Sequence, residues 1–262
     1  MKRALVTSFA TVAMMAILAI GSGTAIAEHH EGGFKVIPVD LSACEYREKK
    51  GPKDLDAYVA RFNTWADAKG LNDLSVWTLT SYYFGPGDHS DFDFIWMIAG
   101  KTAVALGKTH DTWVTDGDGL QKTADEIASC ASHSNFTSVN YKPTPAGRTP
   151  QDSLLTFSDC NFREGATFEE LGTAMAAWAS YLGEKGSEAG IFHWYPVYGG
   201  GGEKFDFKWL EVHSSFEAMG GDYEIFGNGR GWEKHGELLG PLVSCDAARV
   251  YQAKSRRFTQ LR

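Results

Sequence analysis

The chain has 262 residues, of which 43% are hydrophobic, 22% charged and 13% aromatic, and its formal net charge is −8. This composition is too apolar for a disordered chain and too rich in charge for a polytopic membrane protein. Acidic residues outnumber basic ones by 33 to 25, which argues against nucleic-acid binding, since that needs a basic surface. We therefore expect a globular protein with a sizeable core and no nucleic-acid partner.

Residues 1–27 have the three parts of a secretory signal peptide. A basic start at Lys2-Arg3 is followed by an almost wholly apolar run over 4–20 and by the small-x-small cleavage site Ala25-Ile26-Ala27. The alternative is a membrane anchor, for which the apolar run is slightly short. The sequence thus predicts a periplasmic or secreted protein with no membrane segment after cleavage.

Cleavage after Ala27 would leave His30 as the third residue of the new N-terminus. A free amine, two backbone amides and this imidazole can supply four nitrogens in a square plane, a geometry that Cu²⁺ and Ni²⁺ favour. The alternative is a frayed, solvated terminus whose histidines bind nothing.

The chain repeats itself with a spacing of about one half of its length. Cys44-Glu-Tyr-Arg-Glu returns as Cys160-Asn-Phe-Arg-Glu, 116 residues later. The apolar positions that follow have the helical i, i+3, i+4, i+7 pattern in both halves. They are Leu55, Tyr58, Val59, Phe62, Trp65 and Ala66, matched by Leu171, Ala174, Met175, Trp178, Tyr181 and Leu182. Pro52 and a Thr167/Glu170 capping box suit the helix starts, and Gly70 and Gly186 suit their ends.

A hairpin and a broken helix are expected next in each half. Strands are predicted over 76–84 and 191–198, and Gly-containing turns then lead to two aromatic strands. Alternation predicts that Phe92, Phe94 and Trp96 share a face, as do Phe205, Phe207 and Trp209. Glycine-interrupted helical stretches over 102–129 and 215–244 precede short final strands over 136–141 and 249–253.

Each half therefore has the order β-α-β-β-α-β of the ferredoxin-like fold. This order, with a Trp-rich third strand and a broken helix after it, resembles the dimeric α+β barrel superfamily, here as a tandem duplication in one chain. We expect an α+β fold in which two ferredoxin-like repeats, 28–141 and 152–262, pair into an intramolecular barrel, with 142–151 as a linker. The resemblance implies several functions, among them cofactor-free monooxygenases, haem-degrading enzymes and haem-dependent chlorite dismutase-like enzymes, and the fold does not choose among them.

The four cysteines bracket the two repeats at matching places. Cys44 and Cys130 flank most of the first repeat, and Cys160 and Cys245 flank most of the second. Four cysteines in an exported protein allow three disulfide connectivities, and the repeat favours one bridge within each half. A metal site is the alternative, but the sequence has no C-x-x-C and no matching histidine spacing.

The aromatic strands supply the candidate ligand-binding residues, which are Phe94, Trp96, Phe207 and Trp209. A cavity between sheet and helices would have aromatic walls here and would suit a small apolar or planar molecule. The alternative is that these side chains only pack the core.

The second half has titratable side chains where the first half has none. His193, Tyr195, Glu211 and His213 correspond to Trp77, Leu79, Ile98 and Gly100 in the sequence alignment of the halves. We take the four second-half residues as candidate catalytic groups, since each of the histidines, Glu211 and Tyr195 can carry or move a proton. The alternative is a strand end that reaches solvent, where such residues need no role.

Three functions remain open at this point. The leading hypothesis is an exported small-molecule-binding or accessory protein with an aromatic-lined site between sheets and helices. The alternatives are a cofactor-free or haem-dependent oxidoreductase and a structural module without a ligand. No motif requires a cofactor. Haem is implied only through the resemblance, in some members of which the broken helix carries a haem ligand, and here that stretch contains His110 and His235.

Overall fold

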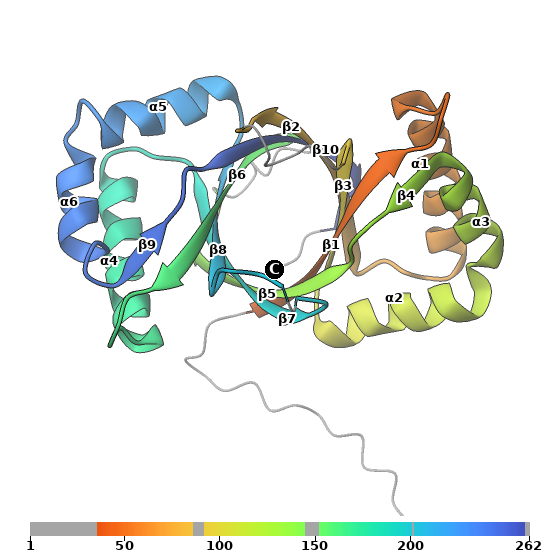
Figure 1. Ribbon diagram of the computed structural model, residues 1–262, viewed down its shortest axis with the longest axis horizontal. Helices are drawn as coiled ribbons and strands as arrows, with labels where there is room; N and C mark the ends of the chain where they lie inside the picture. Colours follow the sequence, from red (N-terminus) through yellow and green to blue (C-terminus); the bar gives the residue numbers. More distant parts are fainter. Residues whose placement is uncertain (1–35, 86–91, 145–151, 201, 260–262) are drawn as a thin grey trace, which may run out of the picture. The chain divides into compact units, whose positions relative to one another are not determined.

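Eight long antiparallel strands form the centre of the fold. They are β1 (Val36–Tyr46), β2 (Leu74–Tyr83), β3 (Phe94–Gly100), β5 (Ser134–Lys142), β6 (Ser153–Phe162), β7 (Gly190–Tyr198), β8 (Phe207–His213) and β10 (Arg249–Arg257). Their order is β10-β2-β3-β1-β5-β7-β8-β6, and pairing of β6 with β10 closes the ring into a barrel (Figure 1). Two short strands, β4 (Ala128–Cys130) and β9 (Val243–Cys245), pair with β1 and β6.

The structure is a computed structural model that describes residues 36–85, 92–144, 152–200 and 202–259. All of these belong to the compact unit 34–262. The expected signal peptide, the expected linker beyond residue 144 and His30 lie outside the described residues.

Six helices in the described residues cover the outside of the barrel, with α1–α3 on one side and α4–α6 on the other (Figure 1). They are α1 (Pro52–Ala68), α2 (Ala103–Asp116), α3 (Asp118–Ile127), α4 (Phe168–Glu184), α5 (Phe216–Phe226) and α6 (Gly231–Leu238). The expected α+β class, the barrel and the two broken helices are confirmed. None of the described helices is long and apolar enough to cross a membrane.

The helix ends follow the sequence signals. Pro52 occupies the first turn of α1, and the Thr167/Glu170 capping box begins α4. Gly70 and Gly186 have φ of 65° and 85°, the left-handed conformation that glycine adopts without strain. These local rules need no tertiary contact, which is why they could be read from the sequence.

Alternation along the strands sends successive side chains to opposite faces of the barrel wall. One set fills the barrel, where Phe136, Phe157, Trp194 and Tyr251 pack ring against ring. The other sets face the helices and form a first-half core beneath α1–α3 and a second-half core beneath α4–α6. The barrel interior is thus one shared core, and each layer of helices has a core of its own.

Two details of the aromatic strands differ from expectation. Phe92 and Phe205 do not share the face of the following aromatic residues, because β3 and β8 begin only two residues later and both rings pack toward the barrel interior. Between them and the strands, Asp93 and Asp206 accept hydrogen bonds from the backbone N–H groups of Tyr46 and Phe162, at 2.7 and 2.8 Å. These aspartates hold the same turn in each half.

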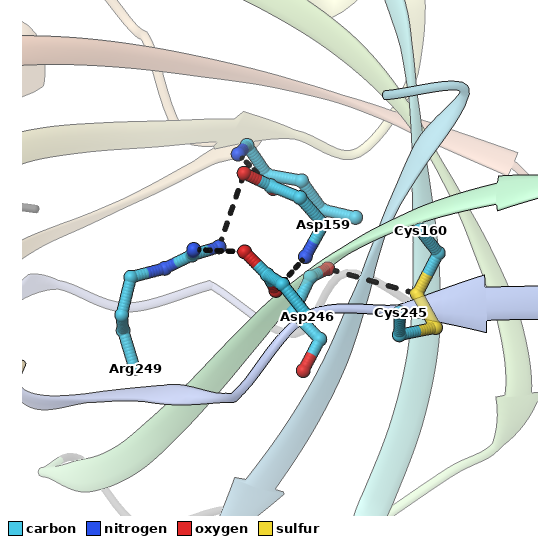
Figure 2. Close-up of polar contacts among 7 residues, drawn as sticks. Asp159, Cys160, Cys245, Asp246 and Arg249 are labelled. Atoms are coloured by element: carbon cyan, nitrogen blue, oxygen red, sulfur yellow. Dashed lines mark hydrogen bonds and ion pairs between the residues drawn. A yellow bond between two sulfur atoms is a disulfide. The ribbon is translucent and has the colours of Figure 1, made fainter. Parts of the chain in front are cut away.

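The disulfides are Cys44–Cys130 and Cys160–Cys245, as the repeat predicted. Each joins a long strand to the short strand beside it, at directly paired positions. In the second half, Arg249 lies between the carboxylates of Asp159 and Asp246, at 3.1 and 2.6 Å, next to the Cys160–Cys245 bridge (Figure 2).

Replacing either cysteine pair by serine should destabilise the protein by a similar amount. The bridges close loops of 86 and 85 residues, and the chain-entropy model gives about 4–5 kcal/mol for loops of this length. Urea unfolding of the Cys44→Ser/Cys130→Ser and Cys160→Ser/Cys245→Ser variants measures this. Peptide mapping without reduction that found Cys130 joined to Cys160 would contradict the connectivity.

Candidate functional site

A cavity of about 560 Å³ lies in the first half, between the barrel wall and helices α1–α3. Its walls are mainly aromatic and include Tyr58, Phe62, Phe94, Trp96 and Trp113. The Cys44–Cys130 bridge forms part of the same wall. The volume is in the range of small-molecule sites, which are mostly apolar with a few placed polar groups.

The second-half core is packed differently at the corresponding place. Trp178 stands in α4 where α1 has the smaller Phe62, and its ring centroid lies 5.2 Å from that of His235 in α6. The His235 ring also contacts Trp209, at 5.8 Å, and Trp209 is only 8% exposed. Trp96, the counterpart of Trp209, is half-buried and lines the cavity. Trp178 and the ring of His235 thus occupy space beside Trp209 in the second half.

A polar cluster stands at the edge of this cavity. Asp40 on β1 is 4% exposed, and its Oδ2 lies 2.7 Å from Nε2 of His110 on α2 and 3.5 Å from Nε2 of His133. Its Oδ1 accepts a hydrogen bond of 2.7 Å from the side-chain amide of Asn135 on β5. The buried carboxylate therefore has partners on both oxygens, as a buried charge requires.

The same cluster also borders a second cavity of about 370 Å³. Asp40, His110, His133 and Asn135 line it together with Tyr198, at the end of β7. The cluster thus stands where an aromatic cavity and a smaller, more open one meet.

The charges of the cluster follow from these contacts. Burial would raise the pKa of Asp40, but hydrogen bonds with His110, His133 and Asn135 hold the pKa of this carboxyl well below its usual range. The hydrogen bond to Asp40 raises the pKa of His133 against the opposing effect of desolvation. Asp40 is therefore a fixed anion at neutral pH, and His133 is protonated more readily than a free histidine.

The four candidate ligand-binding residues separate into two environments. Phe94 and Trp96 line the first-half cavity. Phe207 and Trp209 are buried in the second-half core, where both rings pack against the ring of His193.

The four candidate catalytic residues lie on the helix-facing side of β7 and β8 and form two pairs. The hydroxyl of Tyr195 lies 3.4 Å from Nδ1 of His193, and burial lowers the pKa of His193 to about 3, so that this imidazole is neutral. Nε2 of His213 lies 3.4 Å from Glu211, and its Nδ1 lies 3.1 Å from Asp222 on α5. Both histidines are buried, so neither marks a strand end in solvent.

The alignment of the halves needs one correction. His193 pairs with Trp209 across the β7–β8 ladder, and the residue that pairs with Trp96 in the first half is Thr78. Thr78 is therefore the counterpart of His193, and Leu79, matched to Tyr195 from sequence, is the counterpart of Trp194. Trp77, matched to His193 from sequence, packs toward the barrel interior. The segment between helix and strand is one residue shorter in the second half, and a shift of one residue moves a side chain to the opposite face of a sheet.

The sequence reasoning missed the cluster around Asp40, although the comparison that found the second-half residues could have found it. The ladder registers place Thr156, Ala248 and Val250 at the positions of Asp40, His133 and Asn135. Polar residues that stand in the first half alone carry the same kind of signal as those that stand in the second half alone.

No metal-binding group of three or more His, Cys, Asp or Glu side chains occurs within the described residues. The cluster around Asp40 has two imidazoles and one carboxylate, but Nε2 of both His110 and His133 faces Oδ2 of Asp40 and not a shared point between the three side chains. The cluster is therefore held together by ion pairs and hydrogen bonds.

Comparison with solved structures relates the fold to known proteins. A protein provisionally assigned as a chlorite dismutase matches with a TM-score of 0.50 and 12% identity, over 84% of this chain and 95% of that one. A tryptophan-to-valine mutant of chlorite dismutase from Candidatus Nitrospira defluvii matches with a TM-score of 0.50 and 9% identity, over 86% and 92%. The fold is chlorite dismutase-like.

A haem-binding protein from Thermus thermophilus is also similar, with a TM-score of 0.49, 11% identity and coverage of 84% of this chain and 93% of that one. No protein-family model and no curated protein matches the sequence.

The contacts of His213 with Glu211 and Asp222 should make the free energy of unfolding decrease at alkaline pH. Burial alone would lower the pKa of His213, but Asp222 and Glu211 outweigh it and raise the pKa from 6.5 to about 9. A raised folded-state pKa adds stability that is complete below pH 6.5 and is lost as pH rises through the folded pKa, here about 3 kcal/mol.

Urea unfolding at about pH 6 and pH 9.5 of the protein and of His213→Gln tests this. The unsubstituted protein should lose about 3 kcal/mol more than the variant over that interval. Equal losses would show that the carboxylates do not hold a proton on His213.

Proposed function

We propose that the protein binds a small, planar, largely apolar molecule in the first-half cavity. The aromatic cavity of about 560 Å³, with the cluster around Asp40 at its edge, carries this proposal. Rings of Tyr58, Trp96 and Trp113 offer faces and edges on which a flat molecule can stack. The cluster around Asp40 supplies the orienting polar contact at one end.

Export to an oxidising compartment belongs to the same proposal. The two disulfides support it, because such bridges persist outside the cytosol, and the described residues contain no free cysteine. The apolar start of the chain supports it independently.

We further propose that the two halves are ferredoxin-like repeats of one ancestral unit. The strand orders β5-β1-β3-β2 and β10-β6-β8-β7 are the same when each half is numbered from its own first strand. The aspartates that cap β1 and β6 and the bridges at paired positions also correspond.

A haem-dependent oxidoreductase is the second candidate. The chlorite dismutase-like fold favours it over a plain binding protein among the functions expected from sequence. Bound haem would supply redox chemistry at its iron.

The side chains present do not fit haem as they stand. Histidine normally meets haem iron through Nε2, because a porphyrin at Nδ1 would collide with the Cβ of the same residue, and Nε2 of His110 is already hydrogen-bonded to Asp40. His235 is packed against Trp178 and Trp209. No Lys or Arg is found among the described residues lining either cavity, so two propionates would lack a cationic partner there.

Filling the first-half cavity should strongly weaken the binding of a flat ligand. Ala124 of α3 lines the cavity and is half-buried, so the Ala124→Phe side chain would occupy the space for a ligand. We expect at least about tenfold weaker binding of 2-naphthamide, a flat neutral probe, by isothermal titration calorimetry. Lys122→Phe, on the exposed face of the same helix, is the matched control. Equal affinity in the two variants would place the site elsewhere.

Titration with hemin separates the two candidates. We expect no protein-bound Soret band, because no described histidine presents a free Nε2 to the first-half cavity. A sharp band that disappeared in His110→Ala or His235→Ala, but not in the exposed control Lys122→Ala, would favour the haem-dependent function instead.

A further inference from the structure

His110 and His133 share one hydrogen-bond acceptor, which determines where their protons lie. An ionised carboxylate oxygen only accepts, so each Nε2 that faces Asp40 must carry a hydrogen. The outer nitrogen, Nδ1, is then a bare acceptor in the neutral ring and a donor in the protonated ring. Neither Nδ1 has a protein partner among the described residues.

The carboxylate itself is not free to meet a ligand. Three donors already occupy its two oxygens, and only 4% of the residue is exposed. The imidazoles are accessible, since the side chains of His110 and His133 are 42% and 62% exposed. A molecule in the cavity would therefore contact the histidines and not the acid behind them.

The two cavities beside the cluster are lined by no permanently cationic side chain among the described residues. Among the residues that line the two cavities, Tyr58 on α1, Asp125 on α3 and Tyr198 on β7 are the other titratable groups, and no Lys or Arg is present in the described lining. An acidic group on a ligand can therefore meet a positive charge only if His110 or His133 is protonated.

We propose that the cavity selects planar aromatic acids, whose carboxylate binds the outer nitrogens of His110 and His133 while the ring lies among the aromatic walls. This rests on the proposed function and names its ligand class. The ligand binds as the anion, and a proton from solvent joins one imidazole, so the net charge of the site does not change on binding. The hydrogen bond to the carboxylate of Asp40 raises the pKa of His133 and so favours the protonated imidazole.

The test compares 2-naphthoate with 2-naphthamide, a neutral molecule of the same shape, by calorimetry on the disulfide-bonded protein. Naphthoate should bind roughly tenfold more tightly at pH 6 than at pH 8.5, because one imidazolium charge is lost between them. Naphthamide should show no such change. Repeating the naphthoate titration in buffers of different ionisation enthalpy between these two pH values should show an average uptake of about 0.4 proton, the number that a tenfold change over this interval requires.

Variants assign the effect to the cluster. The pH dependence and the preference for naphthoate should both disappear in His110→Gln/His133→Gln, which keeps polar side chains at both positions. Tyr223→Phe is the matched control, because Tyr223 takes the place of His110 in the second half and is 73% exposed.

The outcomes are distinct. If naphthamide binds and naphthoate shows no preference at pH 6, the selection of acids is wrong and the proposed cavity function stands. If the pH dependence persists in the double variant, the cluster is not its source and the inference fails. If neither probe binds, both the inference and the proposed function are overturned.

Discussion

Closure of the barrel between the two halves is the constraint on which the rest depends. Each half contributes a four-stranded sheet with two exposed edges, and the pairings β2–β10 and β5–β7 remove all four. Strand edges otherwise present unpaired backbone groups that attract other chains. Closure also creates the shared interior, where side chains from the inner faces of both halves form one core.

The outer faces are covered by separate helices. The first-half core lies beneath α1–α3 and the second-half core beneath α4–α6, with a few contacts across the halves, such as Tyr141 of β5 against the second-half core. The ladder pairs Asp40 with Ile98 in the first half, and it pairs Thr156 with Glu211 in the second. Both halves thus hold an acid at the same level of the sheet, but on neighbouring strands and with different histidines.

Most of the architecture could be predicted from sequence because its signals are local. Helix caps, strand alternation and the spacing of the cysteines each depend on a few neighbouring residues. The location of the cavity could not be predicted in this way. It depends on how much room Phe62 leaves beneath α1 and Trp178 leaves beneath α4. That room is set by contacts between segments far apart in the chain. The one-residue difference in length that makes Thr78, and not Trp77, the counterpart of His193 lies in the loop between helix and strand. That loop has no hydrophobic pattern from which the difference could be predicted.

The bridge between Cys44 and Cys130 has a consequence beyond stability, because both residues belong to the wall of the cavity. Reduction would leave two separate thiols and release β4 from its covalent link to β1. The backbone ladder would then be the remaining link between β4 and β1, so this part of the wall is covalently closed only after oxidation. The ligand binding proposed above would in that case depend on the redox state of the compartment as well as on the sequence.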